Sequence, residues 1–515
     1  MSTSTQNKYA GSPTSLVSYT CISIMPEQIL PPLETPIGEL SRRRRVGILF
    51  ICSMSLLIVG LDITIMNVAL PSIGGAFHAP LSGLQWTIDA YTLVLASLLM
   101  ISGSTADRFG RRQTFVIGLV TFALGSLLCS LAPNLATLVV FRMVQAVGGS
   151  MLNPVAMSII TNTFTVARER AQAIGVWAAV VGVSMALGPV VGGFLVSSVG
   201  WRSIFWVNVP VGFITVVLAL RFIPESKAPV ARKVDIPGQL LVIALLSSLT
   251  FGIIEAPDRG WSSLPIVGAF ALAAASLVAF LVWERRATEP LIDLRFFRSV
   301  PFASATVIAV LAFSGLGGFL FLNTIYLQDV RGLSALHAGI DTLPMAAMVM
   351  LLPPVSGRVL SRQGGRIPLA IAGAALAIAC FILVGLSATT PFSWLFCAYA
   401  VFGIGFGFVN APITNAAVAG MPRAQAGVAA AIASTSRQVG ATLGVAVVGS
   451  LVASSLHPGS RAAFALASRA GWWVLAGCGS AILIIGLVAT SGWAEASARR
   501  TAALINPEYL EGGNA

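Results

Sequence analysis

The segment "GSTADRFGRR" at residues 103–112 has a counterpart, "GRVLSRQGGR", at residues 357–366, and this similarity indicates an internal repeat. Aligned without gaps, the two segments share glycine and arginine at four positions: Gly103, Arg108, Gly110 and Arg112 match Gly357, Arg362, Gly364 and Arg366. Val46, where the first apolar run begins, and Val300, where the ninth begins, are separated by the same number of residues as the two segments. The chain is therefore predicted to contain two related halves.

Apolar residues dominate the composition and fall in long runs. Of 515 residues, 56% are hydrophobic and only 10% are charged, whereas a soluble protein carries about a quarter charged residues. The apolar runs are about 20 residues long, enough to cross ~30 Å of hydrocarbon as helix. Fourteen such runs begin near residues 46, 84, 114, 136, 172, 204, 237, 264, 301, 338, 367, 392, 424 and 472. We predict an all-α integral membrane protein with 14 transmembrane helices.

The repeat divides these helices into two halves of six and one additional pair. Residues 46–222 form the predicted N-terminal half, and residues 300–493 form the C-terminal half. The spans at 236–284 are an inserted pair. Residues 1–45 are rich in serine, threonine and proline and are predicted to be a disordered cytoplasmic tail, and residues 494–515 are a second, short tail.

Positive charge is distributed unevenly among the predicted loops. With a cytoplasmic N-terminus, most of the 31 lysines and arginines lie on the inner side, as the positive-inside rule requires. The predicted outer loops hold Arg202, Arg259, Arg331, Arg461 and Arg469. An even number of helices then places both termini in the cytoplasm. We therefore expect an inner or plasma membrane protein whose net charge of +12 faces anionic lipid, without a nucleic-acid partner.

Three charged side chains lie inside the first, second and fourth apolar runs. Asp62 is in "LDITIMNVALP", Asp89 is in "WTIDAYTLVLAS", and Arg142 is in "FRMVQAVGG". A charge at membrane depth costs roughly 2.5–3.5 kcal/mol, so retained charges usually have a function. All three are expected five to seven residues from the outer ends of their spans, at one level. A carboxyl group in low dielectric favours its neutral form, which suits proton exchange. Alternatively, Arg142 bonds backbone carbonyls and only holds helices together.

The loop at 103–112 is predicted to be a breakable latch. Asp107 can accept hydrogen bonds from N–H groups at the start of the next helix or pair with a nearby arginine. The alternative is a plain basic loop, which does not explain the aspartate and the paired glycines. The counterpart loop has Ser361 in place of the aspartate, so the second latch should be weaker. The predicted latch residues are Gly103, Asp107, Arg108, Gly110, Arg111 and Arg112.

The run "GPVVGG" in the fifth span is predicted to bend a helix at an interface. Pro189 removes a helical hydrogen bond, and Gly188, Gly192 and Gly193 permit close backbone approach. Ordinary helix packing is the alternative, because small residues serve it throughout membrane proteins.

Taken together, these motifs resemble the major facilitator superfamily, and within it the fourteen-helix drug:proton antiporters. The resemblance covers about residues 46–493. It also includes "GWRSIFWVNVPVG" (200–212) and "YLQDVRGLSALHAG" (326–339). The chain departs from the family pattern at Ser184 and Ala146, where glycine is usual.

The resemblance implies a major facilitator fold and proton-coupled export of amphipathic drugs or antibiotics by a monomer without cofactors or metal. Proton coupling and substrate binding would involve Asp62, Asp89, Arg142 and Asp341, and it stays open which aspartate carries the proton. Trp86, Tyr91 and Phe141 are candidate cavity walls, the alternative being that they pack helices or anchor at the membrane interface. Glu255 is expected to be solvated at the interface.

The sequence is also compared with four other functions: an importer, a transporter of one metabolite, a channel and an enzyme. A proton-coupled importer, or a transporter dedicated to one metabolite, would share the fold, although "GPVVGG" argues against import. A channel would not need the latch or a carboxylate paired with a buried arginine. An enzyme needs a catalytic cluster, and the sequence has no metal-ligand spacing, nucleophile elbow or phosphate-binding loop. The substrate itself is not determined by the sequence.

Overall fold

The computed structural model describes residues 40–227, 235–287, 289–418, 426–455 and 461–505. Within these ranges every regular element is helical, and 14 helical segments are long and apolar enough to cross a membrane, as predicted. Helices suit this environment because each satisfies its backbone hydrogen bonds internally, which lipid cannot do for it. The predicted disordered tail lies mostly outside the described residues.

The helices follow the two-half division of the sequence. The N-terminal half contains α1 (Arg42–Phe77), α2 (Leu81–Phe109), α3 (Arg111–Ser130), α4 (Leu135–Thr163), α5 (Ala167–Ser198), α6 (Ser203–Trp206) and α7 (Asn208–Phe222). The inserted pair is α8 (Ile236–Arg259) and α9 (Leu264–Glu284). After the short η2 (Leu294–Arg298), the C-terminal half contains α10 (Val300–Ile325), η3 (Tyr326–Val330), α11 (Ala335–Asp341), α12 (Leu343–Leu351), α13 (Pro353–Gln363), α14 (Arg366–Val384), α15 (Phe392–Val418), α16 (Ala426–Ser455) and α17 (Arg461–Ala489). The last helix is α18 (Gly492–Ile505).

The first helix is longer than the sequence predicted. It begins at Arg42, inside the stretch expected to be disordered, and the Ser41 hydroxyl accepts a hydrogen bond from the Arg44 N–H at its start. It ends at Phe77, fifteen residues after Asp62, or about 22 Å of helix. Asp62 therefore lies near the middle of α1, and its expected position five to seven residues from the outer end was wrong.

The tenth span is not one helix but three. Breaks occur at Thr342 and Leu352, directly before helices that have proline in their first turn. Proline lacks the N–H that would continue the preceding helix, so each break follows from the local sequence. Asp341, one of the predicted coupling or substrate residues, is the last residue of α11.

The last span and the tail also differ from expectation. The fourteenth helix begins at Arg461, not near residue 472, so Arg469, expected in an outer loop, lies within α17. The predicted tail includes most of α18. The Ser497 hydroxyl on α18 accepts a hydrogen bond from the Val300 N–H at 2.9 Å and so caps the start of α10.

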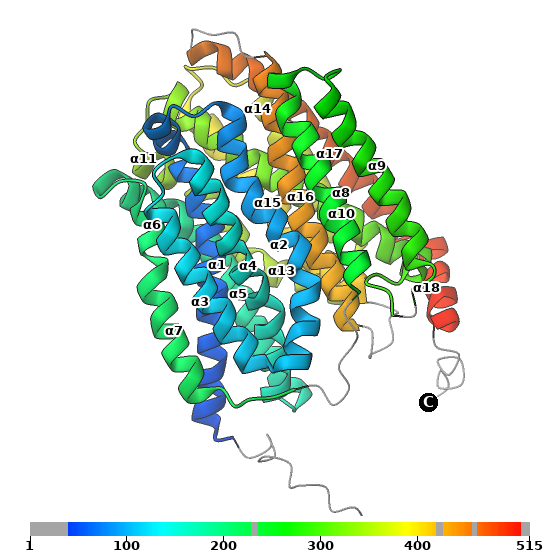
Figure 1. The fold of residues 1–515 in the computed structure, drawn as a ribbon. Coiled ribbons are helices and arrows are strands. Elements are labelled where there is room, and N and C mark those ends of the chain that lie inside the picture. The colour runs from blue at the N-terminus through cyan, green and yellow to red at the C-terminus, as the bar shows by residue number, and fades with distance from the viewer. Residues whose placement is uncertain (1–39, 228–234, 288, 419–425, 456–460, 506–515) are drawn as a thin grey trace, which may run out of the picture. The chain divides into compact units, whose positions relative to one another are not determined.

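The two halves meet along two groups of helices. On one side α2 packs against α16, and on the other α5 packs against α11 and α12. The inserted helix α8 contacts α2 and α16 together, so it touches both halves (Figure 1). We refer below to the α1–α2 end of the helix bundle, which carries the turn at 78–80, and to the α2–α3 end, which carries Gly110.

Candidate transport site

A buried hydrogen-bonded network surrounds Asp62 in the N-terminal half. One carboxylate oxygen of Asp62 accepts from an Nη of Arg142 at 2.5 Å. The other accepts from the side-chain amides of Gln145 at 2.8 Å and Asn208 at 3.0 Å. Asp62 is 4% exposed and Arg142 only 1%. The structure thus brings together two of the residues selected from the sequence, on α1 and α4, as a closed ion pair.

Arg142 has partners besides the carboxylate. Its Nε donates to the Thr87 carbonyl on α2 at 3.2 Å, and the same Nη that bonds Asp62 donates to Gln145 at 2.8 Å. The ring of Tyr91 lies 4.2 Å from the guanidinium carbon, a favourable cation–π distance. These contacts compensate for removing the guanidinium from water, which an isolated charge could not do. Both sequence-based alternatives for Arg142, the carboxylate and the backbone carbonyl, are therefore met at once.

Three polar residues of this network were missed in the sequence. Gln145 lies one helical turn after Arg142, and Asn208 begins α7 within "GWRSIFWVNVPVG". Asn208 also donates to the Ser126 hydroxyl at 3.1 Å, and that hydroxyl donates to the Phe205 carbonyl at 2.9 Å. Gln145, Asn208 and Ser126 are each 1% exposed or less. Their polar side chains within apolar runs could have identified them, because a buried polar group without a hydrogen-bond partner is energetically costly.

Asp89 is buried separately from this network. Its side chain is 0% exposed, and neither carboxyl oxygen has a hydrogen-bond partner among the described residues. The expectation that Asp62, Asp89 and Arg142 share one site therefore holds only for Asp62 and Arg142. The two aspartates have different environments: an ion pair favours the charged form of a carboxyl group, whereas burial without a partner favours the neutral form.

The residues expected to line a cavity have other partners. Tyr91 is 0% exposed and packs on Arg142, while the Trp86 indole N–H donates to Glu255 on α8 at 2.9 Å. Phe141 packs against the hydrophobic core. Glu255, expected to be merely solvated, also accepts from Arg259 at 2.8 Å. In this conformation each of these three aromatic rings has a packing or hydrogen-bonding partner among the described residues.

The charged residues of the C-terminal half are not part of the Asp62 network. Asp341 is partly buried at the end of α11. Arg437 on α16 donates to the Thr414 hydroxyl at 2.7 Å. The ionic groups in the described part of this half are therefore dispersed.

The predicted latch loop is organised by an acidic residue that the sequence analysis missed. Glu225, after α7, accepts from the backbone N–H groups of Arg112 and Gln113, at 3.1 and 3.2 Å, and caps the start of α3. Asp107, which was a candidate for that cap, pairs with Arg111 at 2.8 Å. Gly110 has φ 119°, and a Cβ there would lie 2.6 Å from the Glu225 carboxylate, so glycine is required at this turn.

Loss of the Asp107–Arg111 pair is expected to slow exchange more than loss of the Ser361 hydroxyl in the counterpart loop. The Ser361 hydroxyl only donates to the Arg358 carbonyl of its own exposed helix, so Ser361→Ala removes little. The Asp107 pair is partly exposed and worth at most about 1 kcal/mol, which corresponds to a rate effect of up to about fivefold. Transport rates of Asp107→Ala and Ser361→Ala in the same vesicles measure the difference, and equal rates would contradict an asymmetric latch.

The glycines of "GPVVGG" hold α5 close to two other helices. A Cβ at Gly192 would lie 3.2 Å from the Ile65 Cα on α1, and one at Gly193 would lie 2.7 Å from the Leu336 Cα on α11. From the other side, a Cβ at Gly339 would lie 2.7 Å from the Pro189 carbonyl carbon. Gly193 therefore lies at the contact between the two halves, where the backbones approach too closely for any side chain.

Hydrogen bonds also join the two halves near the α1–α2 end. Gln85 on α2 donates to the carbonyls of Val445 and Ala446 at 3.1 and 2.9 Å, and Gln328 on η3 donates to the Val68 carbonyl at 2.9 Å. Each half thus contributes a glutamine to the backbone of the other. We call this set of contacts between the halves the seam.

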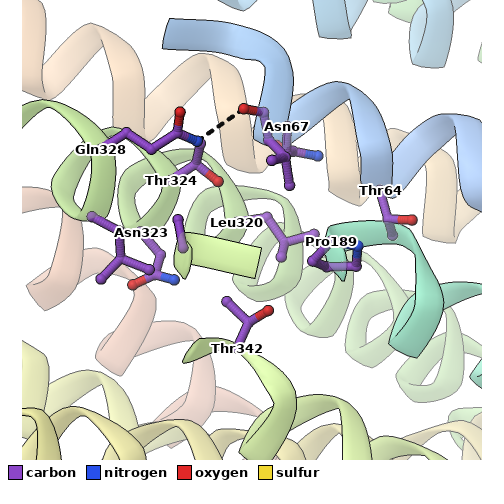
Figure 2. A pocket seen from close by; sticks show the side chains of 11 residues that line it. Thr64, Asn67, Pro189, Leu320, Asn323, Thr324, Gln328 and Thr342 are labelled. Atoms are coloured by element: carbon purple, nitrogen blue, oxygen red, sulfur yellow. Dashed lines mark hydrogen bonds between the residues drawn. The ribbon is translucent and has the colours of Figure 1, made fainter. Parts of the chain in front are cut away.

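A small polar cavity lies within the seam, beside Pro189 (Figure 2). Its volume is about 10 Å³, room for about one water molecule and far too little for a drug-sized compound. Thr64, Asn67, Asn323, Thr324, Gln328 and Thr342 supply its polar lining. In this conformation the two halves are therefore in contact at the α1–α2 end, with no passage for substrate at this cavity.

A bundle of two related helical halves, in contact at one end and holding a buried ion pair, defines a multi-pass membrane transporter. The sequence profile of the Major Facilitator Superfamily matches residues 52–445, and the chain belongs to this superfamily. Members of this family transport small molecules, and as a class they are not enzymes.

Relatives and solved structures agree with this assignment. The chain is 38% identical over 422 residues to the tetracenomycin C resistance and export protein of Streptomyces glaucescens, covering 82% of this chain and 78% of the relative. It is 35% identical over 414 residues to the multidrug resistance protein Stp of Mycobacterium tuberculosis, covering 80% and 77%. A bacterial homologue of the human lysosomal transporter Spinster, solved in an inward-facing and unoccupied conformation, superposes with a TM-score of 0.60 at 18% identity, covering 90% of this chain and 99% of that one.

Proposed function

We propose that the protein exports amphipathic drugs or antibiotics across the cell membrane in exchange for protons. The single observation that carries this proposal is the Asp62–Arg142 pair, a titratable carboxylate and a fixed cation buried together in the core of one half. A structural ion pair in this environment costs desolvation energy that packing alone would avoid. This cost is accounted for if the carboxyl group has a function, alternating between an ion-paired and a protonated form during transport.

Protonation would switch this site by changing its charge balance. When Asp62 takes up a proton, its attraction for Arg142 is lost, and the guanidinium keeps only the hydrogen bonds that it already makes to Gln145 and to the Thr87 carbonyl. These acceptors lie on α4 and α2, whereas Asp62 is on α1, so the change alters how α1 is held against its neighbours. A proton can in this way favour one arrangement of the helices over another.

The proton gradient across the membrane supplies the energy for export, and the orientation of the protein sets the direction of transport. We place the α2–α3 end in the cytoplasm, because the arginine-rich turns at 108–112 and 362–366 lie there and positive charge favours the inner side. The α1–α2 end then faces outward. Each proton that enters gains about 2.3 kcal/mol per 100 mV of membrane potential, in addition to the pH gradient. Outward movement of a drug can be coupled to this gain.

The substrate class rests on the relatives, two of which are named for resistance to an antibiotic or to multiple drugs. A transporter dedicated to a single antibiotic is the second candidate, since one of these relatives is named for tetracenomycin C alone. The two candidates differ in the range of compounds moved and not in the coupling that we propose.

Dye efflux from energised vesicles tests the proposal. Export of ethidium or a similar amphipathic cation is expected to collapse to the background rate when a protonophore dissipates the gradient. Efflux that persists without a gradient would refute proton coupling. If no cationic dye moves while a single antibiotic such as tetracenomycin C does, the dedicated exporter is supported instead. Vesicles without the protein provide the background.

A further inference from the structure

Arg437 on α16 is a cation without an anionic partner among the described residues. One Nη donates to the Thr414 hydroxyl on α15 at 2.7 Å, and the guanidinium carbon lies 5.9 Å from the ring centroid of Phe313 on α10. The Nε of Arg437 is buried and has no hydrogen-bond partner in the described part of the chain. A guanidinium has five N–H donors, so Arg437 can bind a further acceptor. Arg142, by contrast, is matched by the carboxylate of Asp62.

The C-terminal half has few acidic residues that could pair with Arg437. Between residues 300 and 489 there are only two, Asp329 and Asp341. Both lie towards the α1–α2 end, because Asp329 follows Gln328 of the seam and Asp341 ends α11, the first segment of its span. The helices that meet at Arg437, α10, α15 and α16, contain no acidic residue. This half therefore does not balance the charge of Arg437.

Asp89, on the neighbouring helix α2, does not pair with Arg437 either. The Thr442 hydroxyl on α16 donates to the Thr92 hydroxyl on α2, and these two helices run in opposite directions. Arg437 lies five residues from this contact on one side and Asp89 three residues on the other, together about 12 Å of helix. The other acidic residues of the helices around α16 bond other groups: Asp107, Glu255 and Asp258.

The position of Arg437 suits a bound solute better than lipid. Helix α16 is surrounded by α2, α8, α10, α15 and α17, and none of residues 429–453 is exposed. Thr414 and Asn415 are exposed, whereas no residue of α15 from 398 to 413 is. Thr414 lies four residues before α15 ends, at the α2–α3 end, while the halves are in contact at the opposite end. The exposed Thr414 therefore gives Arg437 an approach from the side that we place in the cytoplasm.

We propose that Arg437 binds an anionic group of the exported compound, so that the preferred substrates are amphipathic aromatic acids. This inference rests on the proposed function and narrows its substrate class. A carboxylate can accept two N–H groups of a guanidinium at once, and it would supply the counter-charge that Arg437 lacks. The ring of Phe313, whose centroid is 5.2 Å from that of Phe406, offers an aromatic surface beside the cation for the ring system of the substrate.

The membrane potential favours export of an anionic substrate. The cell interior is negative, so each negative charge that leaves gains about 2.3 kcal/mol per 100 mV, as each proton that enters does. Exchange of an acid for a proton therefore draws on the potential twice. A neutral compound of the same shape would draw on it once.

Binding of pyrenebutyrate and of its uncharged methyl ester tests the proposal. The two probes share their ring system, and at pH 7 only the acid carries a charge. Quenching of tryptophan fluorescence in the purified protein is expected to show the acid bound at least about tenfold more tightly than the ester. In Arg437→Gln this ratio should fall to about one. Arg437→Lys keeps the charge without the planar fork and should retain part of the ratio.

A matched control and the melting temperature separate recognition from a structural role. Arg469→Gln removes an exposed cation from α17 of the same half and should keep the full ratio of acid to ester affinity. Pyrenebutyrate should raise the melting temperature of the unmodified protein but not that of Arg437→Gln. A lower melting temperature of Arg437→Gln with an unchanged affinity ratio would assign Arg437 a structural role and overturn the inference.

The same measurement distinguishes this inference from the proposed function, because binding needs no gradient. Equal affinities for acid and ester in the unmodified protein would overturn the inference, even if ethidium export proves to be driven by protons. If the preference for the acid depends on Arg437 while export persists in the presence of a protonophore, the binding site stands and proton coupling is refuted.

Discussion

Asp62→Asn is expected to abolish proton-driven export while leaving the protein inserted in the membrane. The asparagine cannot ionise, so the site loses its exchangeable proton. The change also leaves Arg142, which is 1% exposed, without its anionic partner. Breaking one side of a buried ion pair destabilises a protein by about 3–5 kcal/mol, so a lower melting temperature should accompany the loss of export.

A second substitution separates the loss of the proton from the loss of stability. In Asp62→Asn/Arg142→Gln no charge is left unpaired, and amide groups can still bond Gln145 and Asn208. We expect this double variant to recover much of the melting temperature of the unmodified protein without recovering export. Full proton-driven export by either variant would exclude Asp62 as the coupling group. Export and melting temperature are measured on the same purified, reconstituted protein.

Gly193→Ala is expected to lower export about tenfold or more by preventing closure at the α1–α2 end. The added Cβ would lie 2.7 Å from the Leu336 Cα and 2.9 Å from the Ala335 carbonyl carbon, both backbone atoms that cannot rotate away. Relieving such a contact costs about 1–3 kcal/mol, which weighs entirely against the state with the halves in contact. The change should therefore shift the equilibrium toward the state that is open at this end.

The same helix offers a matched control. Gly175, also on α5, has no atom within 4 Å of the position that an added Cβ would occupy, so Gly175→Ala should transport normally. Gly339→Ala approaches the contact from the opposite half, where the Cβ would lie 2.7 Å from the Pro189 carbonyl carbon, and should reproduce the defect. Spin labels at Ala76 on α1 and Ser454 on α16, both exposed and in different halves, should report longer distances in both defective variants. Normal export by Gly193→Ala would show that this contact does not form in the cycle.

Some of the candidate functional residues could be identified from the sequence, and others could not. Asp62 and Arg142 were identifiable because a charge within an apolar run is conspicuous and expensive. Glu225 was not, because its role as the cap of α3 depends on a loop more than one hundred residues away in sequence. Trp86 and Tyr91 were assigned to a cavity because aromatic residues serve both cavities and packing, and only their neighbours distinguish the two.

The sequence by itself determined the number of membrane helices, the two related halves, the inserted pair and the buried charges, because bilayer thickness sets helix length and the cost of charge in lipid limits where ions are found. Only the folded chain shows that Asp62 pairs with Arg142, that Asp89 is buried with no hydrogen-bond partner among the described residues, and that Gly193 touches the other half. Helical periodicity gives the face on which each residue lies, but which helix covers that face depends on packing between segments that are distant along the chain.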